Sequence, residues 1–431
     1  MDPHTDSAPR WRSSTRIAFR FCVVYVGLYV VTTQMLSGLI VLPVGSLPEF
    51  GNLPPVRTLV FWVATHLFRI SHTLVVTGSG SGDKTYDWVQ TFCLLVIALV
   101  ATAAWSGVDR HRASYETVHK WFRVFLRFAL GSTVISYGFD KVIPLQMPAP
   151  TLTRLLEPWG NFSMMGVLWS SVGASFGYEI CVGFAEVIGG VLLFVPRMTT
   201  LGALVCLGDT FYIFMLNMTY DVPVKLFSFH LILFSLLLLA PDASRLTNVL
   251  LGRAAGPSKE PPLVRGRRAL RIALAQVIFG AYLVAMNLKG AREGWTTFGG
   301  GAPKSPLYGI WNVDEMSIDG QIRAPLVTDY DRWRRVAFQS PTGAAFQRMD
   351  ETFAFYGARV NMSDRSLTLT RGNDKTWKAS LSFQQPSPDR LIFDGTMGGR
   401  TVHMQLHMVD RNTFTLVNHS FHWIQEYPVN R

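Results

Sequence analysis

The sequence predicts a membrane-embedded all-α helical bundle of about seven transmembrane helices, followed by a C-terminal antiparallel all-β domain built as a small barrel or sandwich. Three observations support this fold class. Nearly half of the 431 residues are hydrophobic and only 16% are charged, a balance typical of polytopic membrane proteins. Seven apolar runs have about the length that a bilayer core requires. The last part of the chain instead alternates apolar and polar residues at period two.

The apolar runs define the helical part of the chain. Runs of about 17 to 25 residues cross a hydrocarbon core roughly 30 Å thick. Residues 17–120 are predicted to contain two spans. Residues 121–250 are predicted to form a four-helix core, and residues 251–290 to contain the seventh span. The predicted spans are Ile17–Leu42, Trp88–Trp105, Trp121–Ile143, Phe176–Val195, Leu201–Met218, Leu226–Ala240 and Leu270–Leu288.

A shorter apolar run lies between the first two spans, at residues 54–74. It opens with two prolines, which favour the start of a helix. It is too short to cross the bilayer, so it predicts an extracytoplasmic interfacial helix.

Basic residues predict the orientation of the bundle. With residues 1–16 as a cytosolic tail, the inside segments carry 15 Lys and Arg residues and the outside loops carry 6. This is the bias that cytosolic loops show. We therefore expect a bacterial inner membrane protein whose Gly/Pro linker (291–306) and β domain (307–431) lie in the periplasm. The bilayer is the expected partner, and nucleic acid is not, because no Lys/Arg-rich arm with interleaved aromatic residues occurs.

The four cysteines lie singly in apolar runs, and no C-x-x-C pair occurs. This pattern predicts neither a zinc site nor a disulfide relay. No phosphate-binding or dinucleotide-binding glycine motif stands between a strand and a helix either. The sequence therefore predicts no metal site and no soluble nucleotide cofactor.

Short strands are predicted throughout residues 307–431. WKASLSF (377–383) and TVHMQLHMV (401–409) each place every second, apolar residue on one face, so His403 and His407 should point to solvent. About eight such strands, separated by turns such as MGGR, predict an antiparallel meander. Gly309 and Trp311, together with Arg431, resemble the lipocalin-like pattern, which implies a small hydrophobic ligand for this domain.

Charged residues interrupt the predicted spans. Glu179 and Glu186 lie on one face of the fourth span together with small residues. A charge at the bilayer centre costs at least about 2.5 kcal/mol, so such residues face the bundle interior and mark functional sites. The candidate catalytic residues are Lys141 and Glu186. The candidate cofactor-binding cluster comprises Arg127, Glu179, Asp209, Asp221, Lys225 and His230.

Matching the charges by depth in antiparallel helices predicts their pairing. Glu186 is expected to pair with the deeper Arg127, and Glu179 with Lys141 near the outer end. The alternative, in which these charges form ion pairs that only hold the helices in register, stays open.

YGFDKVIP, GFAEVIGGVLLFVPRMTTLGAL and YDVPVKL resemble the DoxX family of four-helix bacterial membrane proteins. The resemblance covers about residues 121–250 and involves Arg127, Lys141 and Glu186 with the glycines around them. It implies a quinone- or redox-linked subunit, quinone as cofactor and redox-complex subunits as partners. The alternative is a non-catalytic membrane carrier or scaffold.

A weaker resemblance links the Y-x-x-x-K motif and PRMTT to the HTTM proteins, which include the vitamin K-dependent carboxylase. It implies a carboxylase or epoxidase that uses Lys141 as a base. The chain departs from that pattern because no histidine stands beside this helix. Whether the protein is an enzyme therefore stays open between these readings.

Overall fold

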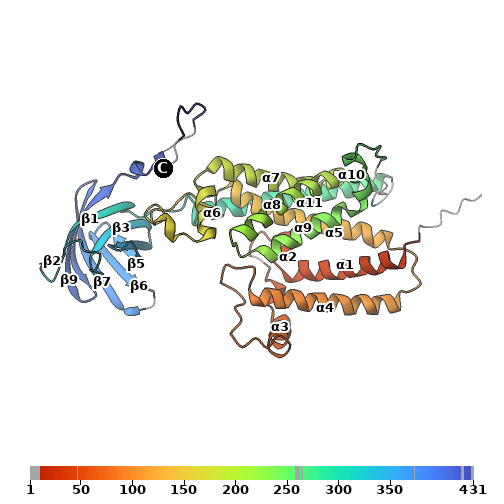
Figure 1. The fold of residues 1–431 in the computed structure, drawn as a ribbon, viewed down its shortest axis with the longest axis horizontal. Coiled ribbons are helices and arrows are strands. Elements are labelled where there is room, and N and C mark those ends of the chain that lie inside the picture. The colour runs from red at the N-terminus through yellow and green to blue at the C-terminus, as the bar shows by residue number, and fades with distance from the viewer. Residues whose placement is uncertain are drawn as a thin grey trace, which may run out of the picture. The chain divides into compact units, whose positions relative to one another are not determined.

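The computed structural model describes residues 10–45, 47–257, 263, 266–372, 374–418 and 422–428. The chain forms two compact units. Residues 1–146 and 178–292 make up the helical unit, and residues 147–177 and 293–431 make up the strand unit. Figure 1 shows the long helices and the strands in these separate parts of the chain. The predicted fold class, a helical membrane bundle with a C-terminal antiparallel β domain, is confirmed.

The longer helices are α1 (Ser13–Thr32), α3 (Pro54–His66), α4 (Thr85–Val108), α5 (Glu116–Val142), α6 (Met164–Gly173), α7 (Phe176–Phe194), α8 (Thr199–Thr219), α9 (Lys225–Leu239), α10 (Ala243–Leu250) and α11 (Arg267–Thr297). Shorter helical segments are α2 (Met35–Leu39), α12 (Thr415–Asn418) and the 3-10 turns η1 (Phe50–Asn52), η2 (Trp159–Asn161), η3 (Pro196–Met198), η4 (Ala240–Asp242) and η5 (Arg411–Thr413).

Six helical segments of the described chain are long and apolar enough to cross a membrane, so the protein is a multi-pass membrane protein. They are Ser13–Thr32, Thr85–Val108, Phe176–Phe194, Pro196–Thr219, Lys225–Leu250 and Arg268–Thr297. The remaining predicted span, at 121–143, forms α5, a 27-residue helix that includes Arg123, Arg127 and Lys141. About half of its side chains are buried by neighbouring helices, so α5 occupies the interior of the bundle.

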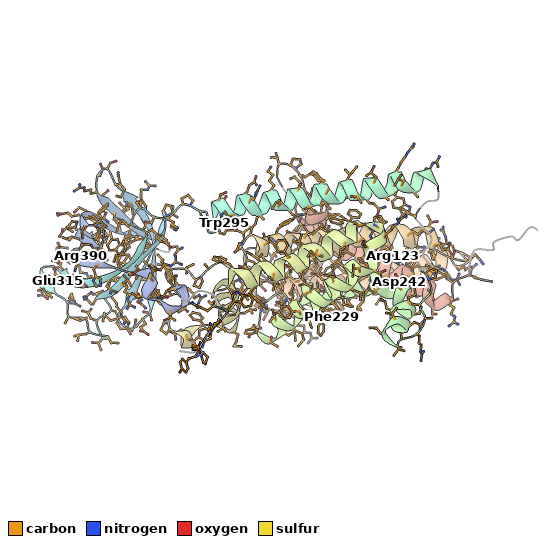
Figure 2. All side chains as sticks on the ribbon, turned by 90° about the horizontal axis from the view of Figure 1, so that it is seen from above. Arg123, Phe229, Asp242, Trp295, Glu315 and Arg390 are labelled. Atoms are coloured by element: carbon orange, nitrogen blue, oxygen red, sulfur yellow. The ribbon has the colours of Figure 1, made fainter. Side chains whose placement is uncertain are left out.

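Among the predicted helix boundaries, three differ most from the structure. The first span ends at Thr32 rather than Leu42, because Thr33 adopts an extended backbone. The helix predicted at 54–74 ends at His66. The last helix continues to Thr297, beyond the predicted start of the linker at 291. Trp295, labelled near the end of α11 in Figure 2, packs against the glycines that follow, where a Cβ at Gly300 would lie 2.4 Å from its ring.

The strands form an antiparallel sheet in the order β2-β1-β3-β4-β5-β6-β7-β8-β9, and β1 also pairs with β9. The described part of the domain is thus an eight-stranded closed barrel with β2 as an appendage. The strands are β1 (Gly309–Ile318), β2 (Gln321–Ile322), β3 (Trp333–Ser340), β4 (Gly343–Arg348), β5 (Phe353–Asn361), β6 (Ser366–Arg371), β7 (Asp374–Ser387), β8 (Arg390–Met397) and β9 (Arg400–Val409).

The inward residues of the barrel follow the predicted alternation. In β9 the apolar residues Val402, Met404 and Leu406 are buried, whereas His403 and His407 lie outside the core and bond to aspartates. Large side chains such as Trp311 fill the interior, so a hydrophobic ligand there would have to displace core residues. Arg431, the predicted cover of Trp311, lies outside the described residues.

The segment before α7 belongs to the strand unit, although the sequence assigned it to the four-helix core at 121–250. Leu152 and Leu156 bury their side chains in a cluster with Ile310 of β1. Two buried or partly buried amides complete the contact. Gln339 Oε1 accepts from the Leu152 amide at 2.9 Å, and Gln347 Nε2 donates to the Leu156 carbonyl at 3.2 Å. Residues 147–177 therefore cover an apolar and polar patch of the barrel.

We expect a fragment of residues 302–431 to fold as a β protein but to melt at a lower temperature than the same fragment linked to residues 147–177. Without that segment the apolar patch is exposed and the Gln347 amide loses its acceptor. Circular dichroism melts compare the two fragments. The matched control carries Leu152→Ser and Leu156→Ser in the linked segment and should melt like the bare fragment. Equal melting temperatures for all three would contradict the assignment.

Two ion pairs stabilise the β2–β3 segment, one within the segment and one between the segment and β9. Asp329 accepts from Arg323 Nε and Nη2, both at 2.8 Å. Asp331 accepts from Arg400 Nη1 of β9 at 2.8 Å. The hydrogen bond from Arg323 lowers the pKa of Asp329, and the hydrogen bond from Arg400 lowers the pKa of Asp331.

Because these pKa values are lower in the folded state, the stabilisation is complete above the unfolded value of about 4 and is lost as the pH falls through the folded pKa. We expect the free energy of unfolding of the 302–431 fragment to fall below about pH 4. Asp329→Asn should flatten this decline, and Glu426→Gln should not. Denaturant titrations between pH 3 and 7 measure it; an identical decline in both variants would contradict the role of the Asp329 pair.

Candidate functional site

A buried ion pair joins α5 to α7. Lys141 Nζ lies 2.8 Å from Oε1 and 2.7 Å from Oε2 of Glu186. Both residues are almost fully buried, with exposed fractions of 5% and 2%. The ammonium group thus donates to both carboxylate oxygens. This contact brings together the two candidate catalytic residues that the sequence predicted.

Four glycines allow the two helices to approach closely. A Cβ at Gly138 of α5 would lie 2.9 Å from the carbonyl oxygen of Gly183. A Cβ at Gly190 of α7 would lie 2.7 Å from the carbonyl oxygen of Gly131. Any larger residue would force the backbones apart, as at other small-residue interfaces of membrane helices. The glycines therefore set the register that places Lys141 near Glu186.

The predicted pairing of Glu186 with Arg127 is wrong, and side-chain direction explains why. In a helix, side chains lean towards the N-terminal end. Because α5 and α7 run antiparallel, Lys141 and Glu186 lean towards each other, whereas Arg127 leans away from Glu186. The Gly131–Gly190 and Gly138–Gly183 contacts also place Arg127 about 12 Å along the helix from the level of Glu186.

Two further acidic residues act electrostatically on this pair. Asp209 of α8 is repelled by Glu186 and attracted by Lys141, and Asp140 is a further negative charge beside Glu186. Oδ2 of Asp209 is buried and has no hydrogen-bond partner among the described residues. The described residues of this site thus comprise one ammonium group and three carboxyl groups, an excess of acidic groups.

Neutral hydrogen-bonding groups stand next to the pair. Lys141 Nζ lies 5.9 Å from the centre of the Tyr137 ring. The hydroxyl of Tyr137 accepts from Gln34 Nε2 at 2.7 Å. Neither residue was predicted, but Tyr137 lies one helical turn before Lys141, and that spacing is readable from the sequence. The donor set of ammonium, hydroxyl and amide can bind carbonyl oxygens.

Asp221 and Lys225 do not join the intramembrane site. They form an i, i+4 pair of 2.8 Å at the start of α9, and the side chain of Asp221 is 87% exposed. Asp83 instead accepts from the backbone amides of Lys225 and Leu226, both at 2.8 Å, and so caps α9. The predicted inward position is wrong because the loop turns through Asp221 with a positive φ of 52°.

His230 also lies in a different contact. Its Nδ1 donates to the carbonyl oxygen of Leu226 at 2.7 Å, and its Nε2 accepts from Tyr25 at 2.7 Å. The ring of Tyr29 stacks on it with centroids 3.8 Å apart. Both ring nitrogens are thus satisfied within the α1–α9 interface, which gives His230 a packing role.

Arg127 and Glu179 occupy other parts of the helical unit. Arg127 Nε donates to the carbonyl oxygen of Leu193 at 2.8 Å, and Nη1 donates to Gln276 at 3.1 Å. Glu179 is fully buried in the first turn of α7, where the helix dipole favours a carboxylate. The predicted single cluster is therefore divided, and Lys141, Glu186 and Asp209 remain together.

The chain is 28% identical over 143 residues to "Uncharacterized protein YwoB" of Bacillus subtilis (strain 168). The alignment covers 33% of this chain and 88% of that protein. No family model matches the chain, and no solved structure matches it. The chain is thus similar over a third of its length to a bacterial protein whose name states no activity.

The geometry predicts how the site responds to neutralising substitutions. Glu186→Gln or Lys141→Met alone leaves a buried charge, which typically costs about 3–5 kcal/mol. Lys141→Met combined with Glu186→Leu should recover most of this loss, because a well-packed apolar pair can replace a buried ion pair. Thermal melts of the solubilised protein measure these changes.

Arg127→Gln serves as the control second substitution. It should not rescue Glu186→Gln, because Arg127 bonds to Leu193 and Gln276 rather than to Glu186. Rescue by Arg127→Gln, without rescue in the Lys141→Met/Glu186→Leu variant, would instead support the pairing of Glu186 with Arg127.

Proposed function

We propose that the protein is a quinone- or redox-linked membrane subunit of the DoxX-like type, with its polar site at Lys141, Glu186 and Asp209. The observation that carries the proposal is the buried ion pair of Lys141 and Glu186, together with the buried Oδ2 of Asp209, which has no hydrogen-bond partner among the described residues. Intramembrane ionisable residues of this kind mark proton relays and ligand sites.

The donor set fits a quinone head group, whose two carbonyl oxygens accept hydrogen bonds. A bound quinone would supply two-electron, two-proton redox chemistry, with electrons from a redox partner subunit. The chain's own contribution is positioning and proton transfer. Lys141 holds Glu186 in place through two hydrogen bonds, and Tyr137 and Gln34 present further polar groups. Asp209 provides a second acidic group from α8.

The site gives less support to a carboxylase or epoxidase that uses Lys141 as a base, and to a non-catalytic carrier or scaffold. As a base, Lys141 would first have to lose a proton while its nitrogen donates to both oxygens of Glu186. One observation favours the carrier or scaffold: both oxygens of Glu186 are bonded to Lys141. A pair satisfied in this way needs no role beyond joining α5 to α7. A carrier or scaffold does not explain why Oδ2 of Asp209 is buried without a hydrogen-bond partner among the described residues.

The proposed location of the protein is the bacterial inner membrane. The bias of 15 basic residues on one side against 6 on the other supports a bacterial inner membrane protein with a cytosolic N-terminus and a periplasmic β domain. The packed barrel interior favours partner docking on the outer face of that domain over a ligand inside it.

Organic extracts of the purified protein test the quinone assignment. We expect the native protein to carry quinone, detected by the difference spectrum on borohydride reduction. Lys141→Met/Glu186→Leu should retain its fold and lose the quinone, because the charged donor and acceptor are gone. The matched control is Asp221→Asn, which changes one exposed carboxylate of the α8–α9 loop. Quinone-free native protein, or equal quinone in native and double variant, would favour the scaffold reading.

A further inference from the structure

A large basic cavity lies at the other end of α5 from Lys141. It has a volume of about 1240 Å³, and α5, η3, α8, α10 and α11 contribute to its walls. Among the described residues, its lining contains five cationic side chains and one carboxylate, a net charge of +4. The charged residues are Lys120, Arg123, Arg127, Arg197, Arg245 and Asp242. Figure 2 shows Arg123 and Asp242 at the same end of the helical unit.

The cationic floor of this cavity is built into the bundle. Arg123 and Arg127 are 6% and 5% exposed, and Lys120 lies on the same face of α5, three residues before Arg123. The carboxylate of Asp242 is already engaged, since it accepts from Arg245 Nη1 at 2.5 Å and from Thr200 at 2.7 Å. Asp242 is the single carboxylate among the described lining residues.

The cavity wall changes from basic to apolar along α8 and α11. Leu201 and Leu204 of α8 line it and are 50% and 41% exposed, and Leu270 and Leu274 of α11 are 75% and 56% exposed. These side chains belong to helices that are apolar enough to cross the membrane. A ligand that fits both parts of the wall must carry an anionic head and hydrocarbon chains.

A tryptophan indicates the depth of the cavity in the bilayer. Trp121 follows Lys120 on α5 and is 54% exposed. Exposed tryptophans concentrate at the level of the lipid head groups. Basic pockets between membrane helices at this level bind the head groups of anionic lipids.

We propose that this cavity is a binding site for an anionic glycerophospholipid of the bilayer. The phosphate contacts the arginines of the floor, and the acyl chains lie along the exposed leucines of α8 and α11. The ligand is a lipid rather than free phosphate, because most of the lining is apolar and free phosphate would leave those side chains uncovered. This site is separate from Lys141 and Glu186 and does not depend on the proposed quinone.

Thermal stabilisation of the full-length protein by added lipid tests the proposal. Phosphatidylglycerol should raise the melting temperature of the detergent-solubilised protein, whereas phosphatidylcholine and inorganic phosphate at the same concentration should not. Lys120→Gln/Arg197→Gln removes two cations from the lining without touching Arg123 or Arg127. The apparent affinity for phosphatidylglycerol should fall by about tenfold or more, as expected for two cations near an anionic head group.

The matched control is Arg12→Gln/Arg110→Gln, which removes the same charge from exposed residues outside the lining. Its affinity for phosphatidylglycerol should stay within about twofold of the native value. Equal losses of affinity for phosphatidylglycerol in both double variants would contradict a specific site and indicate general attraction to the basic surface. Equal stabilisation by phosphatidylcholine would overturn the requirement for an anionic head, and equal stabilisation by inorganic phosphate would overturn the lipid assignment.

Discussion

The close contact between α5 and α7 is the constraint on which the helical unit depends. Gly131, Gly138, Gly183 and Gly190 bring the two backbones together, and that approach lets the Lys141 ammonium reach both oxygens of Glu186. The two features require each other. Without the glycines the two charges would be held apart, and without the ion pair the register that the glycines set would lose a second determinant. A buried pair of this kind thus specifies packing even where its net contribution to stability is small.

Three of the other predicted site residues, His230, Lys225 and Arg127, bond to groups outside this site. His230 bonds to Tyr25 and to its own helix, and Lys225 pairs with Asp221 in the loop before α9. Arg127 bonds to the backbone of α7 and to Gln276 of α11. What remains around Lys141 is an excess of carboxyl groups from α5, α7 and α8. That excess, rather than the number of charged residues in the membrane, makes the site a candidate for proton or ligand chemistry.

The two ends of α5 carry opposite excess charge. Lys141 lies among acidic residues, and the cavity beside Arg127 has a net positive lining. The two positions are separated by about 21 Å along the helix, which is most of a hydrocarbon core. One helix therefore contributes to two polar sites that differ in depth, charge and the ligand chemistry that they favour. The burial of α5 within the bundle is consistent with this, because a helix with this charge pattern could not face lipid along its length.

The sequence by itself determined the elements and the faces that they bury. Hydropathy and length specify the spans, since a bilayer accepts only long apolar helices, and the period-two pattern specifies which strand residues enter the barrel core. It also identified Lys141 and Glu186, because ionisable residues in apolar helices are rare and costly. Only the tertiary structure decided that these two pair with each other, because pairing depends on helix register and side-chain direction as well as depth. It likewise decided that residues 147–177 pack on the barrel, since a loop without periodicity does not indicate in its own sequence which surface it will cover.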